Sequence, residues 1–151
     1  MLIVTSAVAP VLRSFHGSCH CGALGFCFDT ALPVGEWSVR ACQCRFCRAH
    51  GARTTSDPAG RLVFNVGEGE TLRRYRFGLR TADFLLCGRC GVYVGAQIAI
   101  APGAFGIVNT LAMLPIAEEL PAATAVDYGA ESLSERAGRR AQRWTPLEKV
   151  V

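Results

Sequence analysis

Apolar and polar residues alternate in several short stretches of this chain, which is the pattern expected of β-strands. Leu24, Phe26 and Phe28 alternate with small residues, so residues 23–28 are predicted to form a strand with one bulky face. Residues 36–42 (EWSVRAC) alternate in the same way and lead into a cluster of cysteines. Further strands are predicted at residues 82–87, 92–96 and 105–110.

Residues 61–77 (RLVFNVGEGETLRRYRF) are predicted to form a β-hairpin. The glycine-containing GEGE segment in the middle is typical of a turn between two strands. The apolar positions are Leu62, Phe64 and Val66 in the first arm and Leu72, Tyr75 and Phe77 in the second.

One long helix is predicted, near the C-terminus, at residues 130–144 (AESLSERAGRRAQRW). Leu133, Ala137, Arg140, Ala141 and Trp144 fall near one face of this helix, and Arg136, Arg139 and Arg143 fall elsewhere. We find no internal repeat, low-complexity tract or linker. The sequence therefore predicts a single, mainly β domain that is closed by a short C-terminal helix.

Two apolar segments could in principle be a signal peptide or a membrane span. The N-terminal stretch MLIVTSAVAPVL has no basic residue before its apolar run, so we do not expect a signal peptide. The run from Ile98 to Ala117 has the length of a membrane span, but prolines, glycines and an asparagine interrupt it. Such interruptions favour buried strands and turns over a lipid-facing helix. We therefore expect no membrane partner and a cytoplasmic protein in a reducing compartment.

Composition narrows the possible partners. The chain has 151 residues, half of them apolar, and a mean hydropathy of +0.26, which fits one packed globule. Its formal charge of +4 is mild and is not clustered as in nucleic-acid-binding proteins, so nucleic acid is not an expected partner. Lys149 is the only lysine, so almost all the positive charge is guanidinium, which suits recognition of carboxylate or phosphate groups.

Two cysteine pairs form the first candidate site. The first pair is Cys19 and Cys21 (CHCG), and the second is Cys87 and Cys90 (CGRCG). A glycine follows the second cysteine of each pair, which is typical of a turn that presents two sulfurs to one metal ion. Together the four thiols predict a tetrahedral, structural zinc site. Two disulfides or four free buried thiols are the alternatives.

Three further cysteines form a second candidate site. Cys42, Cys44 and Cys47 (CQCRFC) are too close in sequence for ordinary disulfides. Three thiolates leave the fourth position of a tetrahedral zinc ion unassigned, which is the pattern of a catalytic zinc site. We interpret this second site as an open one.

Two residues offer alternatives to an open site. His50 follows Cys47 by three residues and would complete a structural site if it were the fourth ligand. Cys27 would do the same if it reached across from its strand; otherwise it is an inert, buried thiol. We assign no chemical role to His16 or His20.

The motifs GSCHCGAL, CQCRFC and CGRCGVYVGA, in this order, resemble the GFA family of zinc proteins. This family comprises glutathione-dependent formaldehyde-activating enzymes and their centromere-protein-V-like relatives. The resemblance runs from about Gly17 to about Asn109, and Gln43, Arg45 and Phe46 depart from the commoner residues between the ligands.

The resemblance implies a β-tent zinc fold of small antiparallel sheets. It implies one GFA-like domain over residues 1–151, with a core at about 17–115 and a helical tail at about 130–145. It further implies two zinc ions per chain. By resemblance, the structural ion is held by Cys19, Cys21, Cys87 and Cys90, and the ion with an open position by the catalytic residues Cys42, Cys44 and Cys47.

The second site predicts thiol chemistry. Zinc with three thiolates has a net negative charge and is a poor source of hydroxide, but it can bind an incoming thiol as its thiolate. We expect the neighbouring Arg45, Arg48 and Arg53 to offset this charge and to bind substrate carboxylates. By resemblance, the predicted function is a carbon–sulfur lyase that joins glutathione, or a similar small thiol, to formaldehyde or releases it. A non-catalytic, zinc-stabilised binding module that uses the basic helix at 136–143 is the alternative.

Overall fold

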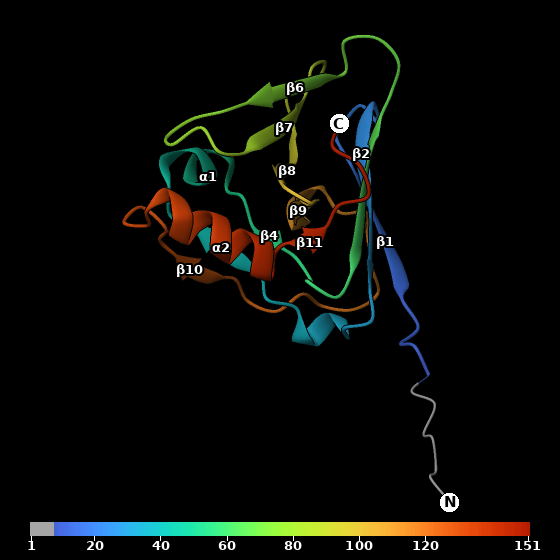
Figure 1. The fold of residues 1–151 in the computed structure, drawn as a ribbon. Helices are drawn as coiled ribbons and strands as arrows, with labels where there is room; N and C mark the ends of the chain where they lie inside the picture. The colour runs from blue at the N-terminus through green and yellow to red at the C-terminus, as the bar shows by residue number, and fades with distance from the viewer. Residues whose placement is uncertain (1–7) are drawn as a thin grey trace, which may run out of the picture.

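The computed structural model of this chain describes residues 8–151; residues 1–7, on which the signal-peptide expectation rests, lie outside the described part. Within residues 8–151, the strands form two sheets, joined by two α-helices and two short 3-10 segments (Figure 1). The strands are β1 (Arg13–Ser18), β2 (Leu24–Thr30), β3 (Arg40–Cys42), β4 (Thr54–Thr55), β5 (Arg61–Val66), β6 (Leu72–Tyr75), β7 (Asp83–Cys87), β8 (Tyr93–Ile100), β9 (Gly103–Asn109), β10 (Thr124–Val126) and β11 (Thr145–Pro146). The helices are α1 (Arg45–His50) and α2 (Leu133–Arg143), and the 3-10 segments are η1 (Val34–Glu36) and η2 (Thr110–Ala112). The predicted mainly β fold with a short C-terminal helix is confirmed.

The smaller sheet is antiparallel, with the order β1-β2-β5. Leu24, Phe26 and Phe28 of β2 are at most 1% exposed, so the predicted bulky face is a core face. Trp37 packs edge-on against the rings of Phe15 and Phe28, at centroid distances of 4.7 and 5.4 Å. Buried aromatic side chains of this kind contribute strongly to the stability of a core.

The larger sheet has the order β10-β3-β4-β9-β8-β7-β6, and β11 also pairs with β9. Its pairs are antiparallel except for β10 and β3, which are parallel. The apolar run at residues 98–117 supplies the end of β8, all of β9 and η2, which confirms the expected strands and turns. Within residues 8–151, no helix is long and apolar enough to cross a membrane.

The hairpin predicted at residues 61–77 is wrong. Both of its strands exist, but β5 pairs with β2 in the smaller sheet and β6 pairs with β7 in the larger one. The GEGE segment therefore connects two sheets, as the green connection at the top of Figure 1 shows. Leu62 and Phe64 are buried in the core, whereas Tyr75 is 49% exposed. The alternation identifies the buried face of each strand but not its partner, because pairing depends on which core that face joins.

The strand predicted at residues 36–42 is confirmed only for Arg40–Cys42. The 3-10 segment η1 ends at Glu36, and in the described part of the chain residues 37–39 are not assigned to a strand before β3 begins. Trp37 and Val39 are nevertheless both 4% exposed. The alternation at residues 36–39 therefore reflects burial of Trp37 and Val39 in the core, and not a hydrogen-bonded strand.

Glycines in the larger sheet allow the two sheets to approach closely. Phe64 of β5 lies over Gly95 of β8 and Gly106 of β9, where a Cβ atom would stand 3.0 and 3.3 Å from its ring. Larger residues at these two positions would crowd the ring and force a shift in the core.

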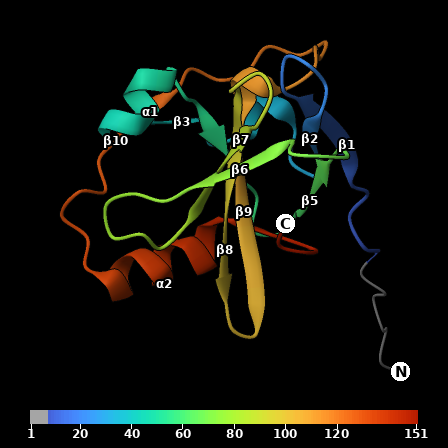
Figure 2. The same cartoon turned by 90° about the horizontal axis from the view of Figure 1, so that it is seen from above.

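Helices α1 and α2 lie on the side of the larger sheet away from the smaller one, as both views show (Figures 1 and 2). Trp144, which follows α2, is 4% exposed and packs with Ala96 and Ile107 of the sheet. The helix begins with a capping box, in which Ser132 Oγ accepts the N–H of Glu135 and the Glu135 carboxylate accepts the N–H of Ser132.

The predicted helix is confirmed, but its predicted inner face is only partly correct. Arg140 is 7% exposed, whereas Leu133 is 58% exposed. Arg136 and Arg139 are half-buried and lie on the inner side. The reason is that this part of α2 borders a pocket rather than a packed apolar surface.

Candidate metal centres

Four thiols meet where the two sheets join. The side chains of Cys19, Cys21, Cys87 and Cys90 bring their sulfurs within 4.8 Å of one another. The Sγ atom of Cys21 lies 3.7 Å from that of Cys19 and 3.5 Å from that of Cys87. Four sulfurs around one zinc ion, with bonds of about 2.3 Å, would stand about 3.8 Å apart. Disulfides need a separation of about 2.05 Å, and all eight cysteines are free.

Backbone amides surround these sulfurs. The N–H of Leu24 donates to Cys19 Sγ (3.3 Å), and the N–H groups of Arg89 and Cys90 donate to Cys87 Sγ (3.3 and 3.4 Å). Donors of this kind favour thiolates, which are the form that binds a metal. Gly22 and Gly91 adopt the left-handed φ values of +83° and +79° that these tight turns require.

The cluster holds its protons unequally. The pKa of Cys90 falls to about 6: burial opposes the fall, but amide donors at Val92 and Cys21 and neighbouring thiols outweigh it. The backbone amide of Ala23 acts to lower the pKa of Cys21, but its hydrogen bonds with Cys87 and the other thiols, together with burial, outweigh this effect and raise the pKa to about 11. The four thiols therefore influence one another's protonation, and together they can release protons when a metal ion binds.

The second cluster lies at the junction of β3 and α1. Cys42 ends β3, Cys44 is the N-cap residue of α1, and Cys47 lies in its first turn. Their sulfurs also lie within 4.8 Å of one another, and Cys44 Sγ accepts the N–H of Cys47 at 3.4 Å. A hydrogen bond from Cys47 lowers the pKa of Cys42 to about 6, and the same bond raises the pKa of Cys47. The cluster thus favours at least one thiolate at neutral pH.

Neither sequence alternative for the fourth ligand joins this cluster. Among residues 8–151, no fourth His, Cys, Asp or Glu ligand atom lies within the same 4.8 Å reach. His50 packs instead against Phe46, with a centroid distance of 4.5 Å. Cys27 lies in β2 and donates to Asp29 at 3.3 Å, and burial raises its pKa. His16 and His20 also lie outside both clusters.

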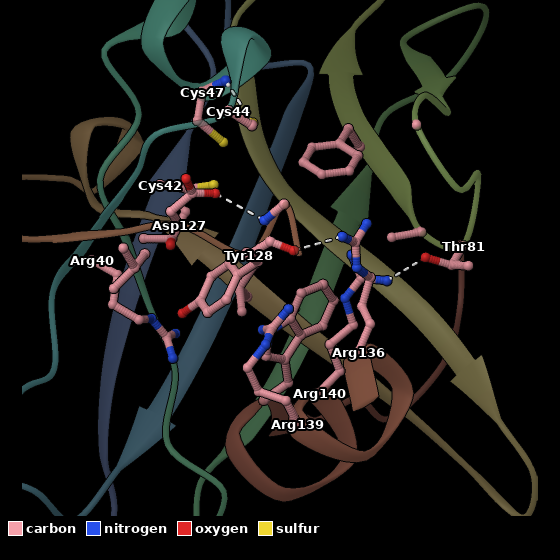
Figure 3. A pocket seen from close by; sticks show the side chains of 18 of the residues that line it. Arg40, Cys42, Cys44, Cys47, Thr81, Asp127, Tyr128, Arg136, Arg139 and Arg140 are labelled. Carbon is pink, nitrogen blue, oxygen red and sulfur yellow. Dashed lines mark hydrogen bonds between the residues drawn. The ribbon is translucent and has the colours of Figure 1, made fainter. Parts of the chain in front are cut away.

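A pocket of about 200 Å³ lies beside the second cluster (Figure 3). Cys42, Cys44 and Cys47 all line it, and no residue of the four-thiol cluster does. Its apolar wall includes Phe84, Ile107 and Trp144. The two metal centres therefore differ in surroundings as well as in their number of thiols, because only the three-thiol cluster borders this pocket.

The guanidinium groups in this pocket are not the predicted ones. Arg45, Arg48 and Arg53 are exposed and do not line it. On α1, the inward positions are occupied by Cys47 and Phe46, which leaves the two helix arginines on the outer side. The pocket is lined instead by Arg40 of β3 and by Arg136, Arg139 and Arg140 of α2.

Sequence reasoning assigned Arg136, Arg139 and Arg140 to the basic helix of a binding module and did not place them beside the three thiols. These three recur at the i, i+3 and i+4 spacing that places helix residues on one side, which is the signal that identifies them. Arg40 is a single buried arginine in a short strand and has no comparable signal. Burial lowers the pKa of Arg140 to about 10, with Arg139 and Arg136 contributing, so the guanidinium remains charged at neutral pH.

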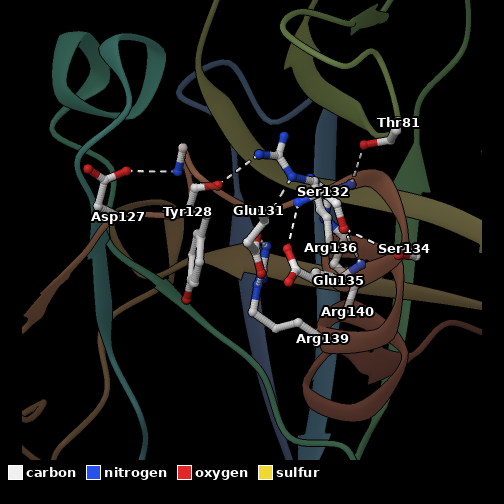
Figure 4. Close-up of polar contacts among 11 residues, drawn as sticks. Thr81, Asp127, Tyr128, Glu131, Ser132, Ser134, Glu135, Arg136, Arg139 and Arg140 are labelled. Carbon is white, nitrogen blue, oxygen red and sulfur yellow. Dashed lines mark hydrogen bonds and ion pairs between the residues drawn. The ribbon is translucent and has the colours of Figure 1, made fainter.

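The segment between β10 and α2 holds two of these arginines in place (Figure 4). Arg139 donates two hydrogen bonds to Glu131, at 2.7 and 2.8 Å, and its guanidinium carbon lies 3.6 Å from the ring centroid of Tyr128. Arg136 donates to the carbonyl oxygen of Tyr128 at 2.8 Å. Asp127, which also lines the pocket, directly follows Val126, the β10 partner of Cys42.

Tyr93 packs beside the three-thiol cluster, next to an irregularity in the sheet. The register of β7 and β8 shifts between Leu85 and Leu86, so that Leu85 pairs with Gly95 and Leu86 pairs with Tyr93. Tyr93 packs with Cys47 and is 1% exposed, and its hydroxyl has no hydrogen-bond partner within residues 8–151. Burial, followed by the charges of the three cysteines, raises its pKa, so the hydroxyl keeps its proton.

A comparison with known protein families agrees with the cysteine pattern. A family model described as glutathione-dependent formaldehyde-activating enzyme matches residues 14–131. Both cysteine clusters fall within this range, whereas α2 begins after it. A crystal structure of a Rhodobacter sphaeroides protein is 29% identical to this chain, with a TM-score of 0.49, and the match covers 74% of this chain and 99% of the other.

Proposed function

This chain belongs to the family of glutathione-dependent formaldehyde-activating enzymes, as its cysteine motifs predict, and we propose that it is a zinc-dependent carbon–sulfur lyase. It would join a small thiol such as glutathione to an aldehyde such as formaldehyde, and catalyse the reverse release. We further propose a reducing compartment such as the cytoplasm, in which thiol ligands of a metal stay reduced.

An incomplete set of metal ligands beside a pocket carries this proposal. The four-thiol cluster can saturate a tetrahedral ion, whereas Cys42, Cys44 and Cys47 leave one position free. Zinc fits both donor sets, because it accepts thiolates in tetrahedral geometry. Bound at the three-thiol cluster, zinc would supply a position at which a thiol is held as its thiolate.

Residues of the pocket have roles in the rest of the reaction. A bond forms between the thiol sulfur and the aldehyde carbon, and the carbonyl oxygen becomes a hydroxyl that takes up the proton lost by the thiol. Asp127 is the only carboxylate among the described residues that line the pocket, and we assign it the transfer of this proton. Arg140 and Arg40 offset the negative charge of the thiolates, and Phe84 limits access of water.

The rival function, a non-catalytic binding module, has weaker support. It depends on a basic surface along α2, but the side chains of Arg136 and Arg139 are only 17% and 15% exposed. Arg140 is buried as well, so of the four arginines expected on that surface Arg143 alone is exposed. Salt-dependent binding to polyanions, without thiol binding, would favour this rival.

Exchange spectroscopy by NMR tests the proposed activity. The zinc-loaded protein is expected to accelerate exchange between formaldehyde hydrate and the S-hydroxymethyl adduct of glutathione by about tenfold or more over buffer. The reason is that a positioned thiolate attacks without first having to lose its proton in solution. Metal-free protein serves as the control, and equal exchange rates with and without zinc would contradict the proposal.

A further inference from the structure

Helix α2 gives the pocket an excess of positive charge. Arg40, Arg136, Arg139 and Arg140 line it, and Asp127 is the one acidic side chain among the described lining residues. Glu131 pairs with Arg139 and lies 3.7 Å from Arg136. Arg140 and Arg40 form no ion pair within residues 8–151. The uncompensated charge therefore lies on buried guanidinium groups.

These guanidinium groups also have unused donors. Arg140 donates from Nη1 to Thr81 at 2.7 Å and Arg136 donates from Nη2 to the carbonyl of Tyr128, so the second terminal nitrogen of each guanidinium makes no hydrogen bond within residues 8–151. A carboxylate in the pocket is the acceptor that fits a planar, charged fork best.

The side chains of Arg139 and Arg140 are held in position by other residues of the protein, without a ligand. Arg139 is held by its two bonds to Glu131 and by Tyr128, and Arg140 also lies over the ring of Trp144, 4.9 Å from its centroid. Figure 4 shows the side chains of Arg136, Arg139 and Arg140 projecting from α2. Long side chains that are already ordered lose little entropy when they bind an anion.

The pocket is also small. Its volume of about 200 Å³ lies below the roughly 300–1,000 Å³ of typical ligand pockets. This space suits a short thiol acid, whereas a tripeptide thiol would extend well outside it. The thiols and the arginines line the same small pocket, so one compact ligand can contact both.

We propose that the substrate thiol is a compact one with a carboxylate, which Arg140 and Arg136 bind while its sulfur lies at Cys42, Cys44 and Cys47. This inference rests on the proposed function and identifies α2 as the element that determines specificity. The family match ends at residue 131, so the specificity element lies in the part of the chain that follows it.

Calorimetric binding of three thiols to the zinc-loaded protein tests this inference. Mercaptopropionate is expected to bind at least about tenfold more tightly than mercaptopropionamide, which has the same size but no charge, and more tightly than glutathione. Equal affinity for the acid and the amide, or tighter binding of glutathione, would overturn the inference while leaving the proposed function standing. If none of the three thiols binds, the proposed function fails as well.

Two helix variants identify the groups that are responsible. Arg140→Met is expected to remove the preference for the acid over the amide, whereas Arg143→Met, on the exposed side of the same helix, is expected to keep it. Arg136→Met provides a second test if Arg140→Met does not fold. Binding of propionate, which has no sulfur, gives a readout that does not depend on the metal, and it is expected to weaken in the pocket variants only. A preference that survives in both pocket variants would overturn the inference.

Discussion

Replacing Cys87 with serine is expected to unfold the protein. Cys87 and Cys90 lie at the turn between β7 and β8 in the larger sheet, and Cys19 and Cys21 lie at the turn between β1 and β2 in the smaller one. A metal ion bound by all four therefore joins the two sheets. Structural zinc sites have apparent binding energies of about 10–16 kcal/mol, which compares with a total stability of about 5–15 kcal/mol for a typical domain.

Far-ultraviolet circular dichroism and zinc analysis measure this effect. Cys87→Ser is expected to lose the β-sheet signal and both zinc ions. Cys27→Ser is the matched control, because Cys27 lies outside both clusters and a serine hydroxyl can also donate to Asp29. A Cys87→Ser protein with the spectrum and melting temperature of the wild type would show that the four-thiol cluster does not hold the sheets together.

Replacing Cys44 with serine is expected to abolish thiol binding and leave the fold intact. Cys44 is the N-cap residue of α1, and serine is among the preferred residues at this position, so the helix should still form. A serine hydroxyl is not a thiolate ligand, so the zinc ion of the second cluster should be lost. The exchange rate should then lose its whole acceleration, about tenfold or more, and fall to the rate measured in buffer.

Zinc content, circular dichroism and exchange NMR on Cys44→Ser check this prediction together. One zinc ion is expected to remain, with a native spectrum and no acceleration of exchange. If Cys44→Ser and Cys87→Ser collapse to the same extent, the two clusters do not have distinct roles. If Cys44→Ser keeps full activity, the three-thiol cluster is not the reaction centre.

Much of the fold could be predicted because buried strand positions recur at every second residue, and this alternation is visible in the sequence. The alternation of Leu24, Phe26 and Phe28 identified the core face of β2, and the interruptions within residues 98–117 excluded a membrane helix. The grouping of the seven clustered cysteines was also predictable. Close thiol spacing and a following glycine constrain which sulfurs can meet, even when the pairs are far apart in the chain.

Pairing and pocket chemistry could not be predicted in the same way. The alternation of β5 and β6 is equally compatible with one hairpin or two sheets, and only the shared core decides between them. Sequence proximity favoured Arg45, Arg48 and Arg53 as partners of the three thiols, although helix geometry directs Arg45 and Arg48 outward and Arg53, which follows α1, is exposed. The arginines of α2 lie about ninety residues further along the chain, and tertiary structure alone brings them to the pocket.

X-ray absorption spectroscopy at zinc, on protein with both sites loaded, tests the difference between the two clusters most directly. We predict four sulfurs at one ion and three at the other, and a rise of the second from three to four when glutathione or mercaptopropionate is added, with no change on adding an S-methylated thiol. A sulfur count that stays the same with thiol, together with an imidazole nitrogen from His50 at the second ion, would contradict an open site.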